Sequence, residues 1–334
     1  MTKLMRYLRN SINPALTVLL ISSLFLSACA RKLPPPAKTN VEEKFLASFN
    51  KTAKLDYPVY TTTRTVGKTL WIYIATDKDI LTINSSSNKG GVLPEKNIKF
   101  LDITCQYENS AFDINYIFLK YSPEEKEKEK DLFKKTVGGT TLYQDFTNAT
   151  IEILQKAYFS IGDIIRDTEN MNFFAICLAN IKNGIKITFV IHRLDMEQFL
   201  LNMLPSDEFY NRMILKADGS KDIINDKYGL HIEYNDILLV DFLREQIVNN
   251  AKAKINEMEK YGAERIKSLD KLDDIILKSI YEVVTKYKFS DFDLVEIQDL
   301  ISKDRLSISR TRLLSKFSNP SPAYSLEDEN PTSL

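Results

Sequence analysis

Residues that bind transition metals are scarce in this chain of 334 residues, which has three cysteines and two histidines. It contains no Cys-x-x-Cys pair, and His192 and His231 lie far apart, so the spacing of a zinc site is missing. The 45 basic residues are balanced by 45 acidic ones without a basic block, which argues against a nucleic-acid partner. GxSxG, Walker A, HExxH and GxGxxG motifs are also missing. The sequence therefore predicts no catalytic residue, no metal ligand and no cofactor.

Long apolar runs are rare as well, and the most informative one stands near the N-terminus. The first ten residues carry Lys3, Arg6 and Arg9 and no acid. A mostly apolar run follows from Pro14 to Phe25, which is shorter than the roughly 20 residues of a membrane-spanning helix. A basic segment, a short apolar run and small residues before a cleavage point are typical of a secretory signal peptide. We expect that signal peptide to occupy residues 1–28.

The signal ends in Leu26-Ser27-Ala28-Cys29, which resembles the lipobox of bacterial lipoproteins. The resemblance implies that Cys29 becomes the first residue of the mature chain and carries acyl groups that anchor it to a membrane. Ala30, rather than an aspartate, follows the cysteine, and this resembles sorting to an outer membrane. The predicted location is the cell envelope, on the periplasmic side of the outer membrane if the source has one.

After the cysteine, composition divides the chain into a spacer, a body and a tail. Residues 29–39 include three consecutive prolines, which favour an extended polyproline II tether. Residues 40–317 form a globular α+β body of one large or two modest domains, with a candidate break near residues 122–140. Residues 318–334 are rich in serine, proline, asparagine and acids, which predicts a disordered tail.

Within the body, a helix followed by a β-hairpin recurs three times. The helices are expected at Asn40–Lys54, at about Thr141–Asp167 and at Ser268–Lys288, from apolar residues spaced three and four apart. The paired strands are Val59–Thr65 with Thr69–Thr76, Asn172–Ile181 with Ile185–His192, and Phe292–Leu300 with Arg305–Arg310. Hairpins with packed helices predict an α+β fold with a mainly antiparallel sheet. A true repeat of the helix-hairpin unit is a further hypothesis.

Further elements lie between these units. Ile98–Tyr107 and Phe112–Tyr121 are expected to form another strand pair, and a short charged helix is expected from Ser122. Asp195 and Ser206 are the expected caps of two short helices. The last expected elements are a strand at Tyr228–Tyr234 and a long helix at Ile237–Lys260.

One group of side chains is a candidate interaction surface, because methionine and aromatic residues gather over the two short helices. Such a surface suits a partner helix or lipid, although packing against the sheet as core explains the same pattern. Its members are Met196, Phe199, Leu200, Met203, Leu204, Phe209, Tyr210 and Met213.

The remaining reactive residues have simpler explanations than catalysis. His192 ends an expected strand and has no identifiable catalytic partner. Acids gather at Asp291, Asp293 and Glu296, and again near Asp270, where they complement a helix dipole. The two other cysteines fall in expected strands, where burial as separate small apolar residues is favoured over a disulfide; they are Cys105 and Cys177.

These observations favour a lipid-anchored envelope protein that interacts with another envelope protein or assists assembly, without catalysis. Two alternatives stay open. A lipoprotein that binds a small ligand or lipid would hold it between helix and sheet, and a cell-wall hydrolase would need two converging carboxylates or a metal.

Lipidation is directly testable. Cys29→Ala should block processing after residue 28 and move the protein out of the membrane fraction, because the acylated side chain is lost. Intact-mass measurement of the wild-type protein should show a chain that begins at Cys29 and carries acyl groups. An unmodified Cys29 in a chain that is still bound to membranes contradicts the prediction.

Overall fold

The computed structural model describes residues 41–85, 98–120, 142–260 and 269–318. The predicted signal peptide, Cys29, the tether, the candidate break, the charged helix after Ser122 and residues 319–334 of the predicted tail lie outside this part. The chain divides into two compact units, each built from two separate segments. Within the described ranges, the first unit comprises residues 41–85 and 142–238, and the second comprises residues 98–120 and then 239–260 with 269–318.

The first unit is built on a five-stranded sheet of order β1-β2-β7-β8-β9. Neighbouring strands are antiparallel except for the central pair β2 and β7, which run parallel with Thr69 opposite Phe173. Every residue of β2 and of β7 is buried, so both faces of the sheet are covered at its centre. The strands are β1 (Val59–Val66), β2 (Thr69–Thr76), β7 (Phe173–Asn180), β8 (Ile185–His192) and β9 (Ile214–Gly219).

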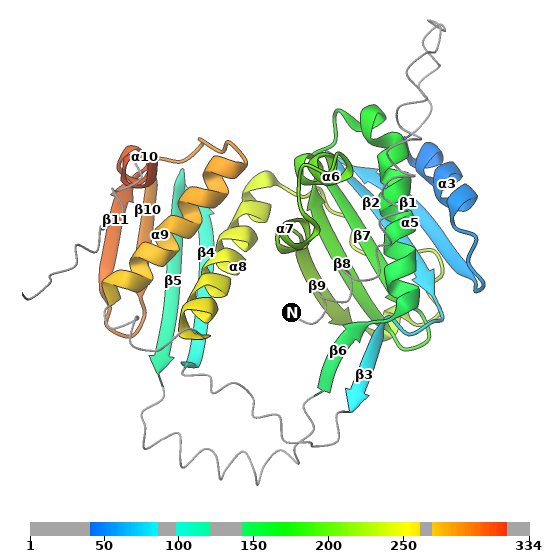
Figure 1. Cartoon of the computed structure of the whole chain (residues 1–334), viewed down its shortest axis with the longest axis horizontal. Coiled ribbons are helices and arrows are strands. Elements are labelled where there is room, and N and C mark those ends of the chain that lie inside the picture. Colours follow the sequence, from blue (N-terminus) through cyan, green and yellow to red (C-terminus); the bar gives the residue numbers. More distant parts are fainter. Residues whose placement is uncertain (1–40, 86–97, 121–141, 261–268, 319–334) are drawn as a thin grey trace, which may run out of the picture. The chain divides into compact units, whose positions relative to one another are not determined.

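Two helices, α3 (Val41–Thr52) and α5 (Asn148–Ile164), cover one face of this sheet (Figure 1). The predicted start of the second helix near Thr141 is wrong, because Leu142–Phe146 forms strand β6 and pairs with β3 (Leu81–Ser85). The helix begins instead after Thr147, whose hydroxyl accepts the N–H of Thr150 at 3.2 Å as an N-cap.

The second unit has a four-stranded sheet of order β11-β10-β5-β4, in which β5 and β10 are the parallel pair. Burial alternates along β10, so this sheet has one buried face. Helices α8 and α9 lie along the sheet (Figure 1). The elements are β4 (Ile98–Glu108), β5 (Ala111–Lys120), α8 (Leu239–Lys260), α9 (Leu269–Lys286), β10 (Leu294–Asp299), β11 (Arg305–Ser309) and α10 (Arg310–Ser318).

The α+β class and its hairpins are therefore confirmed, with one addition. Both sheets are mixed, since each joins two hairpins through a central parallel pair. Parallel neighbours need a crossover connection, which contains α5 on the way to β7 and α9 on the way to β10. In the described part of the chain, a helix followed by a hairpin is found three times, as predicted: α3 precedes β1 and β2, α5 precedes β7 and β8, and α9 precedes β10 and β11. At the level of the units, a pair of hairpins with a crossover helix recurs.

The two units match in backbone detail as well. Asn172, just before β7, accepts the N–H of Arg193, the first residue after β8, at 2.8 Å. Asp293, just before β10, accepts the N–H of Arg310, the first residue after β11, at 2.9 Å. In both units a helix begins at that arginine, so the last strand and the following helix are fastened to the central strand in the same way.

The two units are also alike where the central strands β7 and β10 end. β7 ends at Asn180, whose side-chain oxygen accepts the N–H of Lys182 at 2.9 Å. β10 ends at Asp299, whose carboxylate accepts the N–H of Ile301 at 2.8 Å. Both side chains are buried and organise the turn of the second hairpin, which is the role of an Asx turn.

The apolar face of α9 allows a test of the core of the second unit. Ile276 is fully buried with Leu272, Ile280 and Val283, as the spacing predicts. Ile276→Ala should lower the free energy of unfolding by about 2–5 kcal/mol through lost burial and a cavity, measured by urea unfolding. Ile301→Ala is the control, because that side chain is exposed in a turn and should change stability by about 0.5 kcal/mol or less. Equal effects of the two substitutions would contradict this placement of α9.

Candidate functional site: a strap across the first sheet

Residues 220–238 cross the face of the first sheet that the helices leave uncovered; we call this segment the strap. Ile223, Asp226, Gly229 and Ile232 are buried, which is a period of three. The predicted strand at Tyr228–Tyr234 is therefore wrong, because a strand alternates with period two and this segment lies on a sheet rather than in one.

Small residues on the sheet allow the strap to approach closely. The strands below it contribute alanines and a cysteine alongside two large aromatic side chains, and Ile223 and Ile232 of the strap pack with them. The sheet residues of this core beneath the strap are Trp71, Tyr73, Ala75, Ala175, Cys177 and Ala179.

Three alternate residues of β2 hold the backbone of the strap. The Thr69 hydroxyl accepts the N–H of Ile237 at 2.8 Å. The Trp71 indole N–H donates to the carbonyl of Asn235 at 2.8 Å, and the Tyr73 hydroxyl donates to the carbonyl of Asp226 at 2.5 Å. These side chains share one face of β2 because strand residues alternate, and burial raises the pKa of Tyr73 well above its usual range.

Asp226 organises the bend at the centre of the strap. Its buried carboxylate accepts backbone N–H groups from Tyr228 at 3.3 Å, Leu230 at 3.0 Å and His231 at 3.0 Å. Burial pushes the pKa of Asp226 upward, but the three N–H donors outweigh it and the pKa is lowered.

Gly229 and its contacts fix the same bend. Its φ is +68°, and a Cβ there would lie 2.2 Å from the Tyr234 hydroxyl and 2.9 Å from the Tyr73 ring. The Tyr234 hydroxyl donates to the carbonyl of Gly229 at 2.9 Å, and the Thr62 hydroxyl donates to that of Tyr228 at 3.1 Å. Any larger residue at position 229 would strain this backbone and displace two tyrosines.

The bend presents apolar side chains to solvent although its backbone is fixed. Tyr228 is 63% exposed and Leu230 is 75% exposed, and we call this pair the strap tip. Two cations lie beside the strap tip, each over an aromatic ring. The Lys227 ammonium lies 4.7 Å from the centre of the Tyr60 ring. The Arg64 guanidinium, on β1, lies 4.5 Å from the centre of the Tyr234 ring. The sequence gives no signal for this contact, because the two residues lie far apart in the chain.

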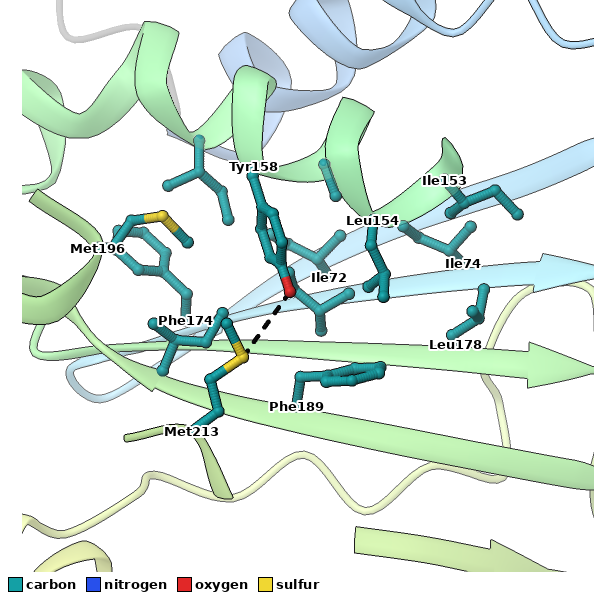
Figure 2. Packing of buried hydrophobic residues seen from close by; sticks show 14 of the residues in the cluster. Ile72, Ile74, Ile153, Leu154, Tyr158, Phe174, Leu178, Phe189, Met196 and Met213 are labelled. Atoms are coloured by element: carbon teal, nitrogen blue, oxygen red, sulfur yellow. Dashed lines mark hydrogen bonds between the residues drawn. The ribbon is translucent and has the colours of Figure 1, made fainter. Parts of the chain in front are cut away.

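The surface predicted from methionine and aromatic residues is mainly core. Met196 and Phe209 have no exposed area and Met213 has 7%. Figure 2 shows Met196 and Met213 pointing into the core beside Tyr158 of α5, whose hydroxyl donates to the Met213 sulfur at 3.7 Å. Of the two interpretations weighed from the sequence, packing as core is therefore confirmed for these residues.

The other members of that predicted surface follow the same pattern, with one exception. Phe199 stacks on Phe209 with ring centres 4.0 Å apart, and Leu204 is buried. Leu200 and Tyr210 are partly buried against the same core. Met203 is 69% exposed, because it follows the end of α6 (Arg193–Leu200) and precedes α7 (Ser206–Asn211).

His192 has a structural role at the start of α6. Its Nδ1 accepts the N–H of Leu194 at 3.2 Å as an N-cap, and burial lowers the pKa of the imidazole. Asp195, predicted as that cap, instead lies buried inside the helix and pairs with Arg212 at 2.8 Å. Ser206 begins α7, and the cap position is Pro205.

The predicted acidic groups and cysteines are placed as follows. Asp274 pairs with Lys316, and Asp293 and Glu296 lie just before and within β10. Cys105 and Cys177 are free and buried in different units, as favoured from sequence, and burial raises the pKa of their thiols to about 12 and about 11. No three His, Cys, Asp or Glu side chains in the described ranges converge as a metal site.

Comparisons give no external guide to the strap. No family model, curated protein or solved structure matches this chain. Among the helices that the structure describes, none has the length and apolar character needed to span a membrane. The function has to be inferred from the residues themselves.

Asp226 provides a test of the strap. Asp226→Asn should increase amide exchange at Tyr228, Leu230 and His231 about tenfold or more, because the charged acceptor is lost. The lowered pKa means that the carboxylate stabilises the wild type above about pH 4 and that this contribution disappears as the pH falls through the folded-state pKa.

Exchange in the wild type should therefore accelerate on acidification relative to the intrinsic rate, and Asp226→Asn should remove that dependence. Amides of β7 are the internal control. Unchanged protection at residues 228–231 in the variant would show that the carboxylate does not hold the bend.

Proposed function

We propose that this protein is a lipid-anchored component of the cell envelope that works by docking with another envelope protein, without catalysing a reaction. The single observation that carries docking is the strap tip: a backbone fixed by hydrogen bonds presents a tyrosine and a leucine to solvent. Binding by a rigid element avoids the entropy cost of ordering it, which is how interfaces gain affinity.

The N-terminal sequence supports the envelope location. The lipobox-like Leu26-Ser27-Ala28-Cys29 supplies an anchor, and the prolines after it supply a spacer. Acyl chains would keep the body near one membrane surface, so that a docking element meets partners confined to the same envelope.

The polar residues most suited to catalysis have structural partners. His192 caps α6, Asp195 pairs with Arg212, and Asp226 binds the strap backbone. A carboxylate engaged by three N–H groups and a histidine whose nitrogen caps a helix are occupied in the folded protein. These contacts support a structural assignment for the residues that a hydrolase would need.

The proposal is tested by separating catalysis from assembly. His192→Asn retains an acceptor at the N-cap, so it should leave both stability and cellular activity unchanged. Native sizing of a mild detergent extract should show the protein in a complex larger than a single lipidated chain. A monomeric extract, together with loss of activity in a stable His192→Asn variant, would favour an enzyme.

A further inference from the structure

We infer that the strap tip inserts into an apolar pocket of a protein partner whose rim carries carboxylates. This inference rests on the proposed function and adds to it the contact residues and the chemistry of the partner. Tyr228 and Leu230 supply the inserted apolar surface, and Arg64 and Lys227 supply the charges beside it.

The shape of the tip favours a pocket. Gly229 is buried between two exposed neighbours, so Tyr228 and Leu230 project from a backbone that is held from below. The Asp226 carboxylate and the hydroxyls of Thr62 and Tyr234 fix this backbone through five hydrogen bonds, three from the carboxylate and one from each hydroxyl. A defined shape is useful against a defined cavity, where complementarity determines affinity.

The positive charges beside the strap tip indicate that the rim of the partner's pocket carries carboxylates. Arg64 and Lys227 form no ion pair with any residue in the described part of the chain. Both lie over tyrosine rings, which leave the cation available to a carboxylate from outside. Tyrosine and arginine are enriched among residues that dominate binding energy, and opposite charges at a rim accelerate and orient association.

A lipid surface fits these observations less well. A fluid bilayer accepts Tyr and Leu side chains without requiring a fixed backbone, and one leucine with one tyrosine adds little to an acyl anchor. A second copy of the chain, which has 45 acidic residues, would also present carboxylates, and the mass of the adduct separates it from a different protein. Both occupants are outcomes that the test distinguishes.

The test uses the full-length lipidated protein in its own membranes, with a photo-crosslinking amino acid in place of Tyr228. The matched control places the same group at Leu215, which is also exposed on the first unit. We expect a discrete protein adduct from position 228 and none from position 215. Arg64→Glu or Lys227→Glu should reduce that adduct at least tenfold, because each reverses a charge that faces the rim.

The adduct is identified by mass spectrometry, and its partner is then purified for binding measurements. Leu230→Ser should weaken binding at least tenfold, Leu215→Ser should leave it unchanged, and added salt should weaken the wild-type complex. Thermal unfolding of each variant within about 2 °C of the wild type, as expected for exposed positions, excludes misfolding as the cause.

Several results would overturn the inference: adducts to lipid alone, adducts to a second copy alone, no adduct, or binding that charge reversal leaves intact. A failure of this inference can be distinguished from a failure of the proposed envelope location. If Cys29 proves unmodified while position 228 still captures the charge-dependent partner, the docking surface stands and the lipid anchor falls.

Discussion

Burial of the central parallel strands on both faces is the constraint on which the first unit depends. Every residue of β2 and β7 is inside, so each face of the sheet needs a cover. Helices α3 and α5 cover one face with side chains of a large apolar core. The strap covers the other face. Backbone groups of this irregular segment form hydrogen bonds with polar atoms of side chains on β2, which stand among apolar neighbours. An irregular segment can lie there because its buried backbone groups have partners.

The second unit has the same arrangement of hairpins around a sheet with a different burial pattern. Its central strands also run parallel, and its last strand and helix are fastened by an equivalent hydrogen bond at Arg310. On β10, however, burial alternates, with Val295 and Ile297 inside and Glu296 exposed. A sheet with polar residues on one face needs no second cover. Within the described ranges, the strap is found on the first unit, and its exposed tip is not required by the arrangement of hairpins common to both.

Local sequence patterns predicted the elements whose partners lie nearby. The hairpin of β7 and β8 was predicted at Asn172–Ile181 and Ile185–His192, close to its observed range. The start of α5 was misplaced because β6 pairs with β3, about 60 residues earlier, a contact without a local signature. The parallel pairs were missed for the same reason. For Met196 and Phe209, an apolar helix face looks alike whether it covers the core or awaits a partner.

The strap itself was inaccessible to these rules because its order comes from distant residues. Its bend is formed by Asp226 and Gly229, but it is held by Thr62 of β1 and Tyr73 of β2, more than 150 residues earlier. Such contacts restrict the backbone without burying the side chains of Tyr228 and Leu230, so the fold bears the entropy cost of ordering the tip before any partner arrives. Fixing a backbone while leaving its largest apolar groups in water brings the isolated protein little stability. A partner that removed those groups from water would gain their burial without ordering the tip, which is the physical reason for proposing docking at the strap rather than at the buried methionines.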